Sequence, residues 1–84
     1  MTKQPESNRN YRDGDVIFLE NDPGGDVFEI IKGTVELSRT GENGRIRLAL
    51  LHPGQTFGGM ESLENGRRAA TARALGMAAI KVLP

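Results

Sequence analysis

Residues 34–50 read TVELSRTGENGRIRLAL and hold the pattern that decides the fold. Apolar and polar residues alternate in 34–39 and again in 45–50, which is the period of a strand with one buried face. The turn between them, 40–44 (TGENG), carries the glycine and asparagine typical of a β-hairpin. The stretch therefore predicts two antiparallel strands joined by a tight turn.

Further short strands are expected on both sides of this hairpin. β-Branched and aromatic residues cluster at 16–19 and 27–31, between turns rich in glycine, proline and aspartate. Gly14, Gly33 and Gly54 each follow a turn and begin a short strand, at spacings of 19 and 21 residues. Regular strand and turn spacing indicates a rolled antiparallel sheet, either a barrel or a jelly roll. Three unrelated turn glycines would give the same spacing.

The C-terminal third is ambiguous by local rules. Residues 67–75 (RRAATARAL) favour a helix by propensity, because alanine is the best helix former. Read with period two, the same stretch places its alternate alanines on one face of a strand. Residues 58–65 (GGMESLEN) fit one or two helical turns that end at Gly66. Residues 77–83 form a further apolar stretch that fits a strand.

Length and composition exclude several classes of protein. The chain has 84 residues and no net charge, which corresponds to one small domain. It has no cysteine and one histidine, His52, so disulfides, thiolate or three-histidine metal sites and a Ser-His-Asp triad are not expected. No apolar run approaches the roughly 18 residues of a membrane span, and the polar N-terminus is not a signal peptide. We expect a cytoplasmic domain at 11–84 after a flexible polar tail at 1–10.

The charge is unevenly distributed along the chain. Residues 1–38 hold eight acids and four bases, a net charge of −4, and residues 39–84 hold seven bases and three acids, a net charge of +4. This asymmetry suggests an anion-facing side in the second half. Arginines on exposed strand faces that bind nothing are the more common explanation of such a pattern.

The segment with the clearest candidate binding residues is 57–71, FGGMESLENGRRAAT. Glycines at a junction between a strand and a helix leave backbone N–H groups unblocked, and a helix N-terminus presents them to an anion. Arg68 adds a guanidinium that can bind phosphate through two N–H donors, beside the small Ala69 and Ala70. Together these residues describe a pocket for one phosphate, without a Walker P-loop or a GxGxxG motif. A turn, a surface helix and a solvated arginine fit the same residues about as well.

This segment closely resembles the phosphate-binding cassette of the cyclic nucleotide-binding domain family. That cassette reads Phe-Gly-Glu, a short helix, and then Pro-Arg-Ala/Ser-Ala-Thr/Ser. Three stretches nearer the N-terminus, 11–18 (YRDGDVIF), 21–28 (NDPGGDVF) and 30–37 (IIKGTVEL), resemble the family's other landmarks in the same order.

The resemblance covers roughly residues 11–84 and implies an architecture. The expected fold is all-β, an eight-stranded antiparallel jelly-roll β-barrel with one short helix in the phosphate-binding cassette. This fold places residues 69–75 in a strand, although their helix propensity favours a helix.

The resemblance also implies a regulatory sensor module that is not an enzyme. Arg68 would bind the exocyclic oxygens of a cyclic phosphate, backbone N–H groups near 58–62 would cap the same phosphate, and the residues after Ala69 would lie along the sugar and base. Ala69 stands where cGMP-binding members often have threonine, which slightly favours cAMP over cGMP. The implied ligand-binding residues are Gly58, Gly59, Met60, Glu61, Ser62, Arg68, Ala69, Ala70 and Thr71. No catalytic residue, metal or cofactor is expected besides the cAMP or cGMP ligand.

Two substitutions depart from the family's cassette. Gly59 replaces the glutamate that takes the ribose 2′-hydroxyl in the family. A hydrogen bond to a charged group contributes roughly 1.5–3 kcal/mol, so its loss could weaken binding about 10- to 150-fold. Glu61 lies two residues later, beyond the ribose position, and is the less suitable substitute. Arg67 replaces the family's proline and adds positive charge near the pocket.

The expected partners follow from what surrounds such a roll in the family. Family members carry a helix before the roll and hinge and lid helices after it, and 11–84 lacks them. The output domain, whether DNA-binding, kinase or channel, is also outside these residues, so no direct binding of nucleic acid is expected. Bare apolar surface would favour a homo-oligomer or an effector domain as partner.

The alternative to a nucleotide sensor is a degenerate jelly roll without nucleotide binding that acts as a protein-interaction or scaffold domain. A cupin-like enzyme is disfavoured, because one histidine cannot build the metal site.

Overall fold

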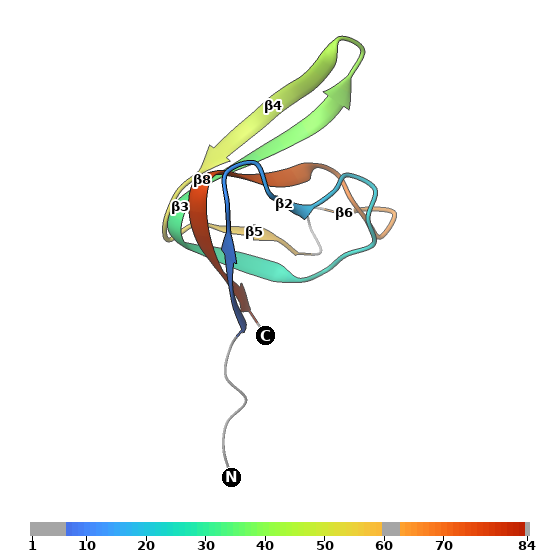
Figure 1. The fold of residues 1–84 in the computed structure, drawn as a ribbon. Coiled ribbons are helices and arrows are strands. Elements are labelled where there is room, and N and C mark those ends of the chain that lie inside the picture. Colours follow the sequence, from blue (N-terminus) through green and yellow to red (C-terminus); the bar gives the residue numbers. More distant parts are fainter. Residues whose placement is uncertain (1–6, 60–62, 84) are drawn as a thin grey trace.

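The computed structural model describes residues 7–59 and 63–83 and has eight strands there (Figure 1). They are β1 (Ser7–Tyr11), β2 (Val16–Phe18), β3 (Val27–Gly41), β4 (Gly44–Leu51), β5 (Thr56–Gly58), β6 (Leu63–Glu64), β7 (Arg67–Arg68) and β8 (Thr71–Leu83). The main antiparallel sheet has the order β1-β8-β3-β4, with β2 also paired to β8 and β5 to β3, while β6 and β7 form a small sheet of their own. The expected all-β antiparallel jelly roll is confirmed.

The two longest strands, β3 and β8, form the centre of this sheet. They pair antiparallel from Val27 opposite Leu83 to Ser38 opposite Thr71. The core consists of eight buried apolar side chains: Phe28, Ile30, Val35, Phe57, Ala72, Ala74, Ala78 and Ile80. Removing apolar surface from water stabilises the folded state by about 25 cal/mol per Å². The long contact between β3 and β8 therefore contributes much of the stability of the domain.

The alanine-rich segment is a strand, as the resemblance implies and as helix propensity does not. Ala72 and Ala74 on one face of β8 are fully buried, whereas Thr71 and Arg73, which alternate with them, are partly exposed. Differences in helix propensity among ordinary residues amount to about 0.7 kcal/mol each at most. Pairing and burial of the alternating face against β3 therefore outweigh the local preference.

Two local expectations need correction. Ser7 to Asn10, placed by the sequence in a flexible tail, form most of β1 and pair with the end of β8, for example Asn8 opposite Lys81. The helix expected at 58–65 is absent where the structure describes that segment, since Leu63 and Glu64 form β6. Residues 60–62 lie outside the described residues.

The β3–β4 hairpin is confirmed, and it projects away from the rest of the roll (Figure 1). β4 pairs with β3 alone and is therefore an edge of the sheet. The alternation in its sequence predicted one buried face, yet its apolar residues Ile46, Leu48 and Leu50 remain 53%, 50% and 39% exposed. A register shift in the pairing places Ile46 opposite Arg39 and Leu50 opposite Glu36, so the apolar residues of β4 are divided between the two faces of the hairpin.

A glycine substitution tests the packing between β3 and β8. Gly33 has a φ of 90°, and a Cβ atom there would overlap the backbone oxygen of Met77. Gly76 has a φ of 72° with open space around it, so it reports the backbone strain alone. We expect Gly76→Ala to lower the free energy of unfolding by about 1–2 kcal/mol, and Gly33→Ala by at least about 1 kcal/mol more. Urea denaturation measures both, and equal losses would contradict the close approach of β3 to β8.

Candidate functional site

Arg68 is a buried charged residue at the end of β7, with 5% of its surface exposed. The turn after β2 holds its backbone from two sides. Its N–H donates a hydrogen bond to the carbonyl of Asp22 at 2.7 Å, and its own carbonyl accepts one from the N–H of Asn21 at 2.8 Å. Asn21 and Asp22 of this turn thus fix the position of an arginine more than forty residues further along the chain.

The guanidinium of Arg68 lies on an aromatic surface. Its central carbon is 4.1 Å from the ring centroid of Phe18 and 5.7 Å from that of Phe28. A desolvated cation over an aromatic face gains about 2 kcal/mol, which offsets part of the cost of burying the charge. The aromatic surface is continuous, because the ring centroids of Phe28 and Phe57 are 5.3 Å apart.

The hydrogen-bonding capacity of this guanidinium is largely unused. Nη1 and Nη2 both point at one acceptor, the carbonyl of Asp26, at long distances of 3.4 and 3.3 Å. The buried Nε has no hydrogen-bond partner. No carboxylate forms an ion pair with it within residues 7–59 and 63–83. Because a guanidinium carries five N–H donors, this group can still accommodate an anion.

A hollow of about 270 Å³ lies beside Arg68. Its wall is mostly apolar, with charged groups at one side. The lining residues are Phe18, Leu37, Arg39, Leu48, Gly58, Leu63, Glu64, Arg68, Ala69 and Ala70. A second, more polar hollow of about 300 Å³ shares Arg39, Glu64, Arg68 and Ala69 with it. A ligand with one anionic group and an apolar or aromatic body fits this combination.

The structure brings together four of the residues that the sequence analysis selected. Gly58, Arg68, Ala69 and Ala70 line the hollow. Met60, Glu61 and Ser62 were selected as well, but they lie outside the described residues.

Two other selected residues occupy different environments. Gly59 is buried, and its N–H donates to the carbonyl of Asp26 at 3.1 Å. Thr71 is not among the lining residues, because its hydroxyl accepts a hydrogen bond from the N–H of Glu20 at 2.9 Å. Thr71 is the first residue of β8 and borders a hollow on the other side of that strand.

Sequence reasoning missed the residues that hold the guanidinium. These are Phe18 beneath it, the backbone carbonyl of Asp26, and Gly24, where a Cβ atom would overlap Nε of Arg68. Gly58 is similarly constrained, since a Cβ atom there would lie 2.5 Å from the oxygen of Asp26 and 3.0 Å from Nη1 of Arg68. The adjacent glycines at 24 and 25 were the available signal for a close approach.

The described segments, 7–59 and 63–83, show no group of three or more histidine, cysteine, aspartate or glutamate side chains that could hold a metal ion. The same segments contain no helix of the length and apolar character needed to cross a membrane.

Comparison with known proteins identifies the architecture. The model of the family described as cyclic nucleotide-binding domain matches residues 8–84. The chain belongs to this family. Its match to residues 8–10 agrees with the early start of β1, since Ser7–Tyr11 pairs with β8.

Individual relatives share the domain at moderate identity. The cyclic AMP receptor protein of Thermus thermophilus is 43% identical over 68 residues, which is 80% of this chain and 32% of that protein. The cAMP-dependent protein kinase regulatory subunit of Mycosarcoma maydis is 32% identical over 68 residues, 81% of this chain and 13% of that protein. The chain thus spans a third or less of the length of these relatives.

A solved structure shares the fold closely. The structure described as cAMP-bound PfPKA-R (141-441) superposes with a TM-score of 0.83 at 34% identity, covering 93% of this chain and 28% of that one. The arrangement of strands around Arg68 therefore belongs to a fold that holds cAMP in that protein.

The space that Gly24 leaves for the guanidinium of Arg68 can be tested without any ligand. Gly24→Ala should push the guanidinium off the ring of Phe18 and lower the free energy of unfolding by about 1–2 kcal/mol. The matched control is Gly25→Ala, where a Cβ atom meets nothing within 4 Å. The NMR signal of the Arg68 Nε–H should lose its ring-current shift in the first variant and keep it in the second. An unchanged signal in Gly24→Ala would contradict the stacked geometry.

Proposed function

We propose that this domain is a cyclic nucleotide sensor in which Arg68 binds the cyclic phosphate. The observation that carries the proposal is the buried guanidinium with unused donors at the side of an apolar hollow. A phosphate placed there supplies charged acceptors to N–H groups that otherwise share one distant carbonyl. Family membership and the cAMP-related relatives support the same ligand class.

The remaining walls suit a sugar and a base. Leu37, Leu48 and Leu63 supply apolar surface, and Ala69 and Ala70 leave room next to Arg68. Alanine at position 69 has no hydroxyl to bond the guanine edge, which favours cAMP over cGMP. The domain binds and releases its ligand without chemical change, so its role is regulatory. An effector domain or a second copy would transmit the signal.

A degenerate roll that acts as a protein-interaction domain is the second candidate. It is favoured by Gly59, which leaves no carboxylate for the ribose and whose φ of 91° would strain any side chain placed there. The two candidates differ in a single measurable quantity, the affinity for cAMP.

Replacement of Arg68 tests the proposed role directly. We expect cAMP to bind more tightly than cGMP, and Arg68→Gln to weaken cAMP binding at least about 100-fold, because the phosphate then lies buried without a counter-charge. Arg67→Gln removes the same charge from the exposed neighbour and should change the affinity less than about 3-fold. Isothermal titration calorimetry measures all four affinities. Equal cAMP affinity in wild type and Arg68→Gln would refute the phosphate contact, and no binding to wild type would favour the scaffold function.

The ribose contact can be tested by changing the ligand alone. With glycine at position 59 no side chain there bonds the 2′-hydroxyl, so 2′-deoxy-cAMP should bind within about 3-fold of cAMP. A bond to a carboxylate would instead impose a penalty of roughly 10-fold or more. Competition between the two nucleotides for the wild-type domain provides the comparison. A large preference for cAMP would show that another group takes over the 2′-hydroxyl.

A further inference from the structure

Several arginines gather around another hollow, next to the hollow beside Arg68, which we call the nucleotide hollow. This other hollow has a volume of about 320 Å³, and we name it the arginine pocket. Three arginines and three hydroxyl residues from β3, β4 and β8 line it: Arg39, Arg45, Arg73, Ser38, Thr40 and Thr71. Side chains alternate along β3, so Leu37 faces the nucleotide hollow while its neighbour Ser38 faces this one.

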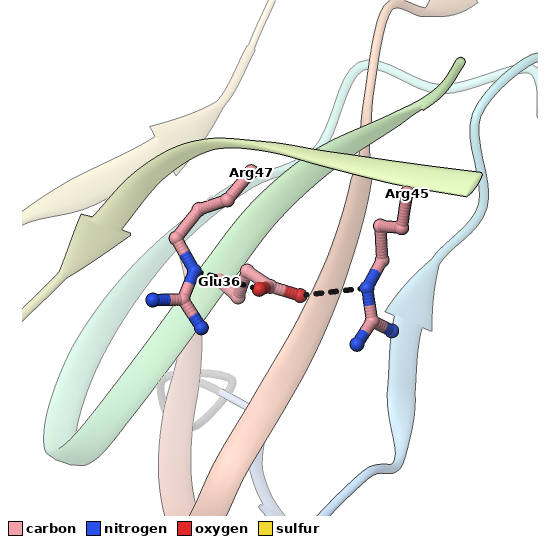
Figure 2. A network of polar contacts seen from close by, with 3 residues as sticks. All are labelled: Glu36, Arg45 and Arg47. Carbon is pink, nitrogen blue, oxygen red and sulfur yellow. Dashed lines mark hydrogen bonds and ion pairs between the residues drawn. The ribbon is translucent and has the colours of Figure 1, made fainter. Parts of the chain in front are cut away.

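Two glutamates lie near the arginine pocket, and Oε1 of one of them, Glu36, is buried without a hydrogen-bond partner. Glu36 is only 2% exposed and lies between two arginines of β4, as Figure 2 shows. Its Oε2 accepts a hydrogen bond from Nε of Arg47 at 2.8 Å, and its Oε1 is 3.5 Å from Nε of Arg45. The carboxylate of Glu20 accepts a hydrogen bond from the N–H of Thr40 at 3.0 Å. Neither glutamate lines the pocket.

The four arginines at and beside the pocket, Arg39, Arg45, Arg47 and Arg73, outnumber the two glutamates there, Glu20 and Glu36, and leave an excess of two positive charges. Arg45 shares one glutamate with Arg47, and its side chain stays 52% exposed. Arg39 and Arg73 form no ion pair within the part of the chain that the structure describes. An excess of this size attracts a small anion with more than one negative charge.

Arg73 supplies an independent indication. Its Nη1 is buried and has no hydrogen-bond partner. Arg73 lies directly opposite Glu36 in the pairing of β3 with β8, and Oε1 of Glu36 is likewise buried without a hydrogen-bond partner, so the two groups do not satisfy each other. A buried donor without an acceptor is unfavourable, and native proteins usually supply the partner.

The geometry points to a second anion site in the arginine pocket that binds the phosphate groups of a small molecule. Three guanidinium groups and hydroxyls converge there from three strands, which suits a tetrahedral group with several acceptor oxygens better than a flat carboxylate with two. The volume leaves room for more than one phosphate group. Arg68 does not line the arginine pocket, so this site does not rest on the nucleotide function of Arg68; the two hollows share Arg39.

Titration with pyrophosphate and with inorganic phosphate tests the site. At low ionic strength the intact chain should bind pyrophosphate with a Kd below about 1 mM, and inorganic phosphate more weakly. NMR should show the shifting amides at 38–40 and 71–73, and saturating cAMP should not displace pyrophosphate from them. Arg73→Gln and the exposed Arg45→Gln should each weaken pyrophosphate binding at least about 10-fold. Arg9→Gln, an exposed arginine on β1, removes the same charge and should leave it within about 2-fold.

Three results would overturn the proposal. The first is a lack of saturation by pyrophosphate below about 10 mM. The second is an equal loss of affinity in Arg9→Gln and Arg73→Gln, which would reduce the effect to net charge. The third is tighter binding of a glutamate-rich peptide than of pyrophosphate through the same two arginines, which would make this a protein-binding surface. Thermal unfolding of each variant confirms that Arg45→Gln and Arg73→Gln remain folded.

Discussion

The antiparallel pairing of β3 with β8 is the constraint on which the rest of the domain depends. It joins residues 27–41 to residues 71–83, so that the core side chains Ile30 and Ile80 face each other across it. The same pairing determines which side chains line the hollow beside Arg68 and the arginine pocket. Arg68 stands just before the first residue of β8, and the alternation of β3 presents successive side chains to opposite faces. A change of register by one residue would exchange the residues that line the two hollows.

Under the proposed function, the environment of Arg68 keeps a buried positive charge available for a ligand. Its guanidinium is held by an aromatic ring and one backbone carbonyl rather than by a carboxylate. A neighbouring glutamate or aspartate would stabilise the empty domain more strongly, but it would compete with an incoming phosphate. The observed environment keeps the cation buried and leaves its donors available. Two glycines, Gly24 and Gly58, provide the space that this arrangement needs.

Much of the fold and part of the site could be predicted from the sequence. The alternation in residues 34–50 predicted the hairpin, and the cassette motif predicted the family and selected Arg68, which the structure places in the wall of a hollow. Local rules failed for residues 69–75, because burial of Ala72 and Ala74 against a distant strand is invisible to propensity.

Other features depended on contacts between distant parts of the chain. The polar segment at 7–10 pairs with β8 through its backbone, which needs no apolar side chains. Glu36, on the polar face of an alternating strand, is buried because two arginines of β4 cover it. The stacking of Arg68 on Phe18 joins residues fifty positions apart, and no spacing rule connects them.

The projecting hairpin has a practical consequence for anyone who handles this domain. β4 combines an unpaired backbone edge with three partly exposed apolar side chains, Ile46, Leu48 and Leu50. Such an edge can recruit another strand, and the chance of meeting one rises with concentration. Stock solutions should therefore be kept dilute, and a lysine in place of Ile46, which lines neither hollow, offers a simple route to samples that stay monodisperse during long measurements.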